Sequence, residues 1–112
     1  MTEHTLYKCP PTAAVVDVLH ERCRQVEEEG YTSKHDDDEH SDGQMATAAA
    51  CYAIGQIITI KGSIARRIPD WSLWPWDMTC WKPKDRRRDL VRAAALLIAE
   101  IERIDRAEEP TP

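Results

Sequence analysis

The segment HDDDEH, residues 35–40, contains two histidines and four carboxylates and is the first candidate for chemistry. Carboxylate oxygens favour Mg²⁺ or Mn²⁺, and imidazole nitrogens add affinity for Zn²⁺, Ni²⁺ and Mn²⁺. The candidate metal ligands are His35, Asp36, Asp37 and His40. The alternative is a solvated acidic loop beside the positive N-terminus of the next helix, because the carboxylates lack the alternating spacing of an EF-hand. The sequence favours the solvated loop, and the metal site is kept as the second interpretation.

A second candidate site combines aromatic rings with cations. All four tryptophans lie within WSLWPWDMTCWKP, residues 71–83, and lysines and arginines follow up to residue 88. Indole rings stack on planar groups and guanidinium groups bind phosphates bidentately, so this composition predicts a nucleotide ligand. The candidate ligand-binding residues are Trp76, Trp81, Lys82, Lys84, Arg86, Arg87 and Arg88. In the structural alternative, Trp71, Trp74 and Trp76 fill the open end of a bundle whose helices contain few large side chains.

Further carboxylates lie at residues 27–29, 89, 100 and 102. A metal site in a helical bundle needs carboxylates three or four residues apart on an inward face, whereas Glu100 and Glu102 are two apart and point in different directions. These acids therefore predict a solvated helix surface. The chain has no glycine-rich phosphate loop and no nucleophile elbow, so binding is favoured over catalysis. The net charge of −5 argues against a general nucleic-acid binder.

Three helices must position these residues. Apolar spacing predicts them over residues 12–29, 43–60 and 85–106. Thr12 is the predicted N-cap of the first helix and Gly30 its end. Its predicted buried face contains Val15, Val18, Leu19, Cys23 and Val26. Residues 31–43 are predicted to form a loop, residues 64–68 one further helical turn, and residues 69–83 an ordered connection interrupted by proline.

The last helix has the clearest pattern. Its apolar positions Leu90, Ala94, Leu97, Ile101 and Ile104 step by four and three residues, which is the heptad spacing of a coiled coil. We refer to these five residues as the α-helical seam. Val91, Ala95 and Ile98 widen the seam to a core-facing stripe. This wide stripe predicts a homodimeric bundle, with a closed three-helix monomer as the alternative.

The length of 112 residues predicts a single domain over residues 1–112, with an arm over residues 1–11 and a frayed tail over residues 107–112. The predicted fold class is all-α. The cysteines, Cys9, Cys23, Cys51 and Cys80, form no CxxC pair, which indicates free, mostly buried thiols in a reducing compartment. No apolar run has the length of a membrane span, and the first residues contain no apolar signal core, so we expect a cytoplasmic protein without a membrane partner.

The segments ERCRQVEEEGYTSKHDDDEHSDGQMATAAACYA, WPWD and WKPKDRRRDLVRAAALLIAEIERIDR together resemble a family of small helical proteins encoded by phages and prophages. The match covers residues 21–106. A weaker resemblance is to the all-α MazG-like NTP pyrophosphohydrolases, which are often dimeric bundles that hold Mg²⁺ with ExxE and ExxD motifs. Residues 102–105, ERID, carry the ExxD pattern, whereas Gln44 stands where the phage family usually has Glu.

These features predict a phage accessory protein of the bacterial host's cytoplasm that acts by binding and needs no cofactor. Its expected action is to counter a host defence system, either by sequestering a nucleotide-type signal or by capping a defence protein. The alternative, implied by the weaker resemblance, is a nucleotide pyrophosphohydrolase that depends on Mg²⁺ or another divalent cation.

Overall fold

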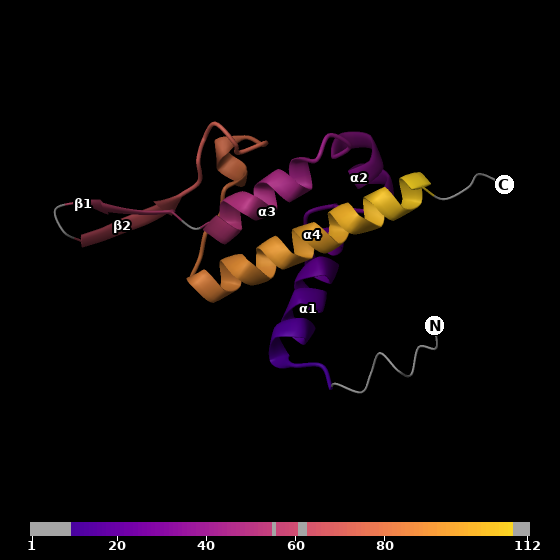
Figure 1. Ribbon diagram of the computed structural model, residues 1–112, viewed down its shortest axis with the longest axis horizontal. Coiled ribbons are helices and arrows are strands. Elements are labelled where there is room, and N and C mark those ends of the chain that lie inside the picture. The colour runs from indigo at the N-terminus through magenta and orange to yellow at the C-terminus, as the bar shows by residue number, and fades with distance from the viewer. Residues whose placement is uncertain (1–9, 55, 61–62, 109–112) are drawn as a thin grey trace.

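Helices dominate the protein, as the sequence predicts (Figure 1). The computed structural model describes residues 10–54, 56–60 and 63–108. In chain order the elements are α1 (Ala13–Glu27), α2 (Ser33–Glu39), α3 (Gln44–Ile54), β1 (Gln56–Ile60), β2 (Ser63–Ile68), the 3-10 helix η2 (Met78–Cys80) and α4 (Arg86–Glu108). Most of the predicted arm and part of the predicted tail lie outside the described residues. Residues 107 and 108 continue α4, so the tail prediction is wrong for them.

The ends of α1 follow the local sequence signals. Thr12 is the N-cap, and its hydroxyl accepts a hydrogen bond from the backbone N–H of Val15 at 3.4 Å. Gly30 has a φ of 73°, a left-handed conformation that glycine adopts without steric cost. Both predicted boundary signals are therefore confirmed.

The main core lies between α3 and α4, where small side chains let the two helices approach closely. Met45, Ala48 and Ala49 of α3 pack with the core residues Ala93, Leu96 and Ala99 of α4. The Trp-rich segment, residues 71–83, supplies the large side chains beside this interface, and Trp74 joins the core with an exposed fraction of 8 %. Trp71 is exposed, so the prediction that it fills the end of the bundle is wrong.

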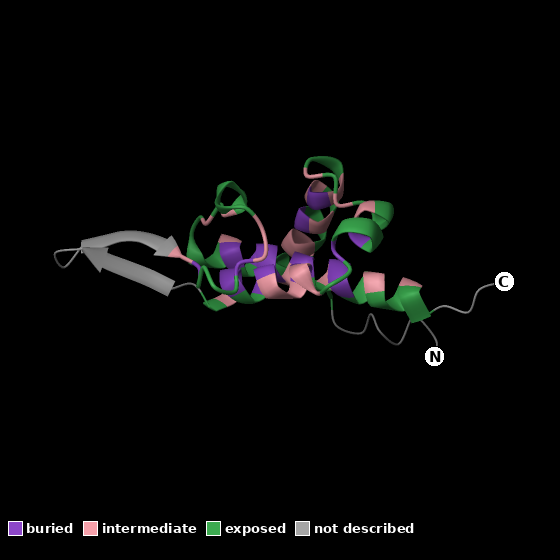
Figure 2. Ribbon diagram, turned by 90° about the horizontal axis from the view of Figure 1, so that it is seen from above, coloured by how far each residue is buried: buried purple, intermediate pink, exposed green. Residues whose placement is uncertain are grey.

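The contact of α1 with α4 is polar where the sequence predicted it to be apolar. Glu21 and Gln25 of α1 are buried, while Val15 and Leu19 are exposed. The same inversion occurs on α4: its buried residues include Val91, Ala95 and Leu96, while four residues of the α-helical seam, Leu90, Leu97, Ile101 and Ile104, are exposed. The predicted buried faces are therefore wrong for Val15 and Leu19 of α1 and for these four seam residues, because an ion-pair network occupies the α1/α4 contact. The prediction is confirmed for Val91 and Ala95, which are buried. Figure 2 shows the buried residues grouped where the helices meet.

A β-hairpin follows α3 and corrects the all-α prediction. Strands β1 and β2 pair antiparallel from Gln56↔Ile68 to Ile60↔Ser63, with an irregularity between Ile58 and Thr59. The consecutive β-branched residues at 57–60 favour a strand over the helical continuation predicted to residue 60. Pairing with β1 replaces the helical turn predicted at residues 64–68.

Among the described helices, none has the length and apolar character needed to cross a membrane.

Candidate functional site

Helix α2 replaces the loop predicted for the HDDDEH segment. Thr32 caps it by accepting a hydrogen bond from the backbone N–H of His35 at 3.2 Å. His40 ends it, and its backbone N–H donates to the Asp36 carbonyl oxygen at 3.0 Å. The four-residue spacing of Asp36 and His40 places both on one helix face. In this helix, Asp36 and His40 therefore point inward, whereas the other acidic side chains of the segment are exposed.

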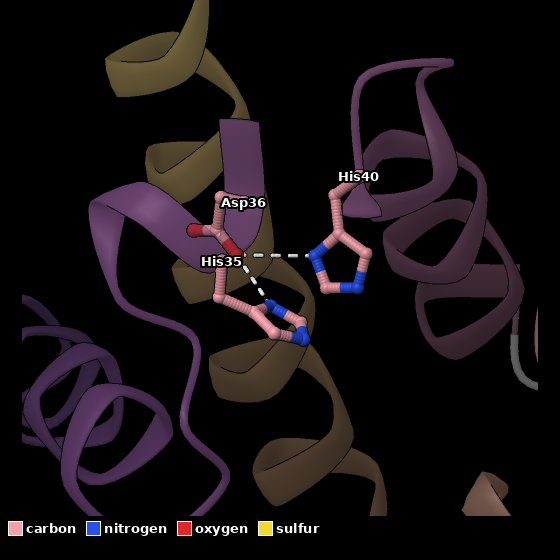
Figure 3. Close-up of side chains that lie close together, drawn as sticks. All are labelled: His35, Asp36 and His40. Atoms are coloured by element: carbon pink, nitrogen blue, oxygen red, sulfur yellow. Dashed lines mark hydrogen bonds and ion pairs between the residues drawn. The ribbon is translucent and has the colours of Figure 1, made fainter. Parts of the chain in front are cut away.

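His35, Asp36 and His40 form a cluster in which Asp36 and His40 are buried and His35 is partly exposed (Figure 3). Asp36 Oδ1 lies 3.1 Å from His40 Nδ1 and 3.6 Å from His35 Nδ1. Asp36 is fully buried and His40 is 4 % exposed. The His35 Nδ1 atom is buried and has no hydrogen-bond partner among the described residues. The structure thus brings together three of the four predicted metal ligands.

Asp37, the fourth predicted ligand, lies elsewhere. Its carboxylate pairs with Arg106 near the end of α4 at 2.8 Å. This ion pair holds the pKa of Asp37 below its usual value, chiefly through the hydrogen bond from Arg106. Asp37 therefore attaches α2 to α4 and does not reach the cluster.

The cluster fits a transition metal better than Mg²⁺. Bonds of about 2.1 Å in a tetrahedral site separate two ligand atoms by about 3.4 Å, and all three candidate ligand atoms lie within 4.8 Å of one another. Two imidazoles and one carboxylate suit Zn²⁺, Mn²⁺ or Ni²⁺, whereas Mg²⁺ prefers oxygen ligands throughout. Burial lowers the pKa of His40, and Asp36 only partly offsets this decrease. The lower pKa favours the neutral imidazole, which is the form that binds a metal.

Aromatic rings surround the cluster. Tyr31 stacks on His35 with ring centroids 5.5 Å apart and meets His40 edge-on at 5.0 Å. Trp76 lies 4.9 Å from His40 and 5.8 Å from Tyr31. Through Trp74, these rings continue to Trp81, which stacks on Tyr52 at 4.5 Å. The Trp-rich segment and the histidines thus belong to one aromatic cluster.

A small cavity adjoins this cluster. Its lining consists of aromatic rings, two cations, two other polar groups and two smaller side chains: Tyr31, Tyr52, Trp76, Lys82, Arg92, Gln25, Glu29, Cys80 and Leu96. Gln25 is 1 % exposed, and within the part of the chain that the structure describes its Oε1 has no hydrogen-bond partner. Burial raises the pKa values of Tyr31 and Tyr52, so both phenols stay protonated. The volume of about 20 Å³ has room for about one water molecule.

The predicted ligand-binding residues divide into a group at or behind the cavity and a group at the start of α4 that lies elsewhere. Trp76 and Lys82 line the cavity, and Trp81 packs on Tyr52 behind it. The backbone N–H of Lys84 donates to Asp89 at 2.8 Å. The arginines at the start of α4 contact three separate partners: Arg86 donates to the Ala53 carbonyl oxygen, Arg87 pairs with Asp17, and Arg88 pairs with Glu21. The arginines therefore do not converge on one phosphate site.

Sequence reasoning missed Gln25 and Arg92, which are the most deeply buried polar groups of the cavity lining. Each is a polar residue of an amphipathic helix, and such residues are expected to lie on the solvent-exposed face of the helix. The available signal was the four-residue spacing of Glu21 and Gln25, and of Arg88 and Arg92, which gives each helix a polar pair on one side. In the structure Arg92 lies over the Tyr52 ring at 5.1 Å and donates to the Lys82 carbonyl oxygen.

An ion-pair network next to the cavity connects α1 to α4. Glu21 contacts Arg24 at 2.7 Å, Arg88, and Arg92 at 3.8 Å. Burial alone would raise the pKa of Glu21, but the hydrogen bonds and charges of Arg24 and Arg88 outweigh it and lower the pKa. The Glu21 carboxylate is thus a structural counter-ion.

Two other carboxylates that the sequence predicted to be solvated are also buried. Glu100 is 8 % exposed and pairs with Arg103 at 2.6 Å. Asp89 is 1 % exposed and accepts from the backbone N–H of Lys84. The surface prediction is wrong for both, because each one satisfies a donor beside α4.

The described cysteines, Cys23, Cys51 and Cys80, are free, as predicted. Only Cys51 among them is buried, so the prediction that the thiols are mostly buried is wrong.

No protein-family model matches the chain, and neither the curated proteins nor the solved structures include a detectable match.

Proposed function

We propose that the protein binds a nucleotide through a divalent transition metal at the His35–Asp36–His40 cluster. The observation that carries this proposal is that Tyr31 and Trp76 contact the cluster and also line the cavity. A metal bound at the cluster and a ring bound in the cavity would therefore be neighbours. A nucleotide has this combination of an anionic phosphate group and a planar base.

The cavity chemistry supports a base that carries an amino group. Aromatic walls provide stacking partners for a base, and such stacking contributes about 1–3 kcal/mol per base. The partnerless Oε1 of Gln25 is an acceptor that an exocyclic amino group would satisfy. Lys82 and Arg92 supply positive charge on the same lining. Adenine, guanine and cytosine offer the amino donor, and uracil and hypoxanthine do not.

Binding requires the cavity to open, because about 20 Å³ does not admit a base. Trp76 and Lys82 belong to the connection between β2 and α4, which contains only the short helix η2 as regular structure. Movement of these two side chains would enlarge the cavity without breaking α3 or α4. We therefore expect association to be slower than diffusion and to change tryptophan fluorescence.

The proposed role is sequestration. The resemblance to phage and prophage proteins supports a nucleotide-type signal of a host defence system as the ligand, held intact. Capping of a defence protein is the alternative form of the same proposal. In both cases the protein acts by binding in the host cytoplasm.

Calorimetric titration tests the proposal with protein first stripped of metal by EDTA. Zn²⁺ or Mn²⁺ alone should bind, and ATP, GTP or CTP should bind only after the metal. UTP and ITP, which lack the amino donor, should bind at least about tenfold more weakly. His40→Ala should abolish metal binding, and Gln25→Met should remove the preference for amino bases. Asp37→Asn is the matched control, and it should bind as the wild type does.

Two results would contradict the proposal. One is a wild type that binds no metal and no nucleotide. The other is equal loss of metal binding in Asp37→Asn and His40→Ala, which would indicate non-specific attraction to the acidic segment.

One observation favours a second candidate, the nucleotide pyrophosphohydrolase. Three protein ligands leave one coordination position open, as in catalytic zinc sites. The two imidazoles and one carboxylate do not fit Mg²⁺, so activity would be expected with Mn²⁺ or Zn²⁺ instead. Chromatography of nucleotides after incubation separates the candidates: intact nucleotide supports sequestration, and release of pyrophosphate supports the enzyme.

A further inference from the structure

Six large apolar side chains of α1 and α4 remain exposed in the single chain. Val15, Leu19, Leu90, Leu97, Ile101 and Ile104 have exposed fractions of 39–57 %. A cavity with an entirely apolar lining lies beside them, formed by Ala14, Val15, Val18 and Leu19 of α1 with Ile98 of α4. Figure 1 shows α1 crossing α4 and extending beyond it, away from α3. Apolar surface of this extent marks an interaction site.

The spacing of this surface indicates its occupant. The exposed α-helical seam repeats in steps of four and three residues, and such a seam packs against a helix with the same repeat. Helix α4 of a second copy has that repeat. We propose that the protein is a two-fold symmetric dimer in which the α-helical seam of α4 packs antiparallel against the same seam of the partner, with the axis at Leu97.

The register is self-complementary about Leu97. An axis there places Leu97 against the partner's Leu97 and Leu90 against the partner's Ile104. Ala94, three residues before the axis, then lies within one residue, about 1.5 Å along the helix, of the level of the partner's Ile101, so a small side chain lies close to a large one. Because the interface is isologous, each of these contacts occurs twice.

Charge selects the antiparallel orientation. The start of α4 carries Arg87, which pairs with Asp17 of α1, and Arg86, whose hydrogen bond goes to the neutral Ala53 carbonyl oxygen. The end of α4 carries the exposed acids Asp105 and Glu108. The arginines at that end are paired within the chain, Arg103 with Glu100 and Arg106 with Asp37. An antiparallel partner brings each basic end to an acidic end, whereas a parallel partner would place like charges together. Opposed helix dipoles favour the same orientation.

Helix α1 would complete the interface. Its exposed Val15 and Leu19 lie at the apolar cavity beside Ile98, next to the seam of α4. Two copies thus form a four-helix contact from both α1 and both α4 helices, which is a common way for helical proteins to bury such stripes. This inference does not depend on the proposed nucleotide binding.

Analytical ultracentrifugation of the full chain at micromolar concentration provides the first test. The wild type should sediment as a dimer. Leu97→Glu places two carboxylates at the axis and should weaken dimerisation about 100-fold or more. Its helicity, measured by far-UV circular dichroism, should persist because Leu97 is exposed in the single chain. Met78→Glu is the matched control, since Met78 is 68 % exposed on η2 away from the seam, and it should remain dimeric.

Cysteine crosslinking tests the orientation and stays informative if Leu97→Glu fails to fold. The background carries Cys9→Ser, Cys23→Ser and Cys80→Ser and keeps the buried Cys51. Leu97→Cys should form a disulfide-linked dimer on mild oxidation. Leu90→Cys and Ile104→Cys should each stay uncrosslinked alone and should crosslink when mixed, and Met78→Cys should not crosslink.

Three outcomes would overturn the proposal. A monomeric wild type would mean that no second copy covers the seam and that another partner does. A dimer insensitive to Leu97→Glu would place the interface elsewhere. Crosslinking of Leu90→Cys with itself would show a parallel pair.

Discussion

Replacement of Glu21 by glutamine tests the structural role of the ion-pair network. Glu21 is a fully buried counter-ion for Arg24, Arg88 and Arg92. Glutamine keeps the volume and removes the charge, so three guanidinium groups lose their shared partner. Removal of one member of a buried pair costs about 3–5 kcal/mol. Arg24 keeps Glu28 and Glu29 as partners, and Arg88 is partly hydrated, so we expect the lower end, about 3 kcal/mol.

Urea unfolding followed by circular dichroism at pH 7 measures this loss, with protein concentration held constant. Glu28→Gln is the matched control, because it removes a carboxylate that pairs with the same Arg24 at 3.3 Å but has a 65 % exposed side chain. Exposed pairs contribute at most about 1 kcal/mol, so the control should unfold almost as the wild type does. A loss below about 1 kcal/mol in Glu21→Gln would refute the reasoning.

The pH dependence gives an independent check on Glu21. Its pKa in the folded protein is lower than the ordinary value of 4.5. The unfolded chain therefore takes up a proton at a higher pH than the folded protein does, and the contribution of Glu21 to stability is complete above pH 4.5 and decreases as the pH falls below it. The difference in unfolding free energy between the wild type and Glu21→Gln should shrink over that range. A constant difference would show that the charge of Glu21 is not responsible.

Three further predictions concern the core, the histidines and a helix end. Trp74→Ala should lower the unfolding free energy by about 3–5 kcal/mol, whereas Trp71→Ala, at a 42 % exposed side chain, should stay within about 0.5 kcal/mol; urea unfolding of both variants checks this. Because burial lowers the pKa of His40 below 6.5, the unfolding free energy should decrease as the pH falls below 6.5. Urea unfolding at pH 7.5 and 5.5 should show a smaller decrease in His40→Gln than in the wild type, because the variant lacks this titrating group. Gly30→Ala should cost about 1 kcal/mol through its φ of 73°, measured by the shift in melting temperature.

Local signals allowed parts of the fold to be predicted. Thr12 and Gly30 mark the ends of α1 through hydrogen bonding and backbone conformation that depend on a few neighbouring residues. Helix α2 was missed because SKHDDDE has no apolar period. Its stability comes instead from the Thr32 cap and from Arg106, a residue 69 positions away from Asp37. A contact at that separation leaves no trace in a local pattern.

The candidate site was only partly predictable for the same reason. His35, Asp36 and His40 were identified by residue type, but the separation of Asp37 from them depends on the helical conformation of α2. The seam of α4 was recognised by its period, yet periodicity does not say which partner covers it. Arg88 and Arg92 attract Glu21 to the opposite side of α4, and this charge network determines which face is buried.

The long-range pairing of α1 with α4 has a consequence for synthesis on the ribosome. Glu21 and Arg88 are separated by 67 residues, and Arg22 and Glu102 by 80. At about 5–20 residues per second, Glu21 is translated roughly 3–13 s before Arg88. The first helix therefore cannot dock cotranslationally on its own partner, and α3 and α4 should assemble first, because they adjoin in sequence through a shorter connection. We expect α1 to be the last helix to fold and the segment of the nascent chain most available to chaperones.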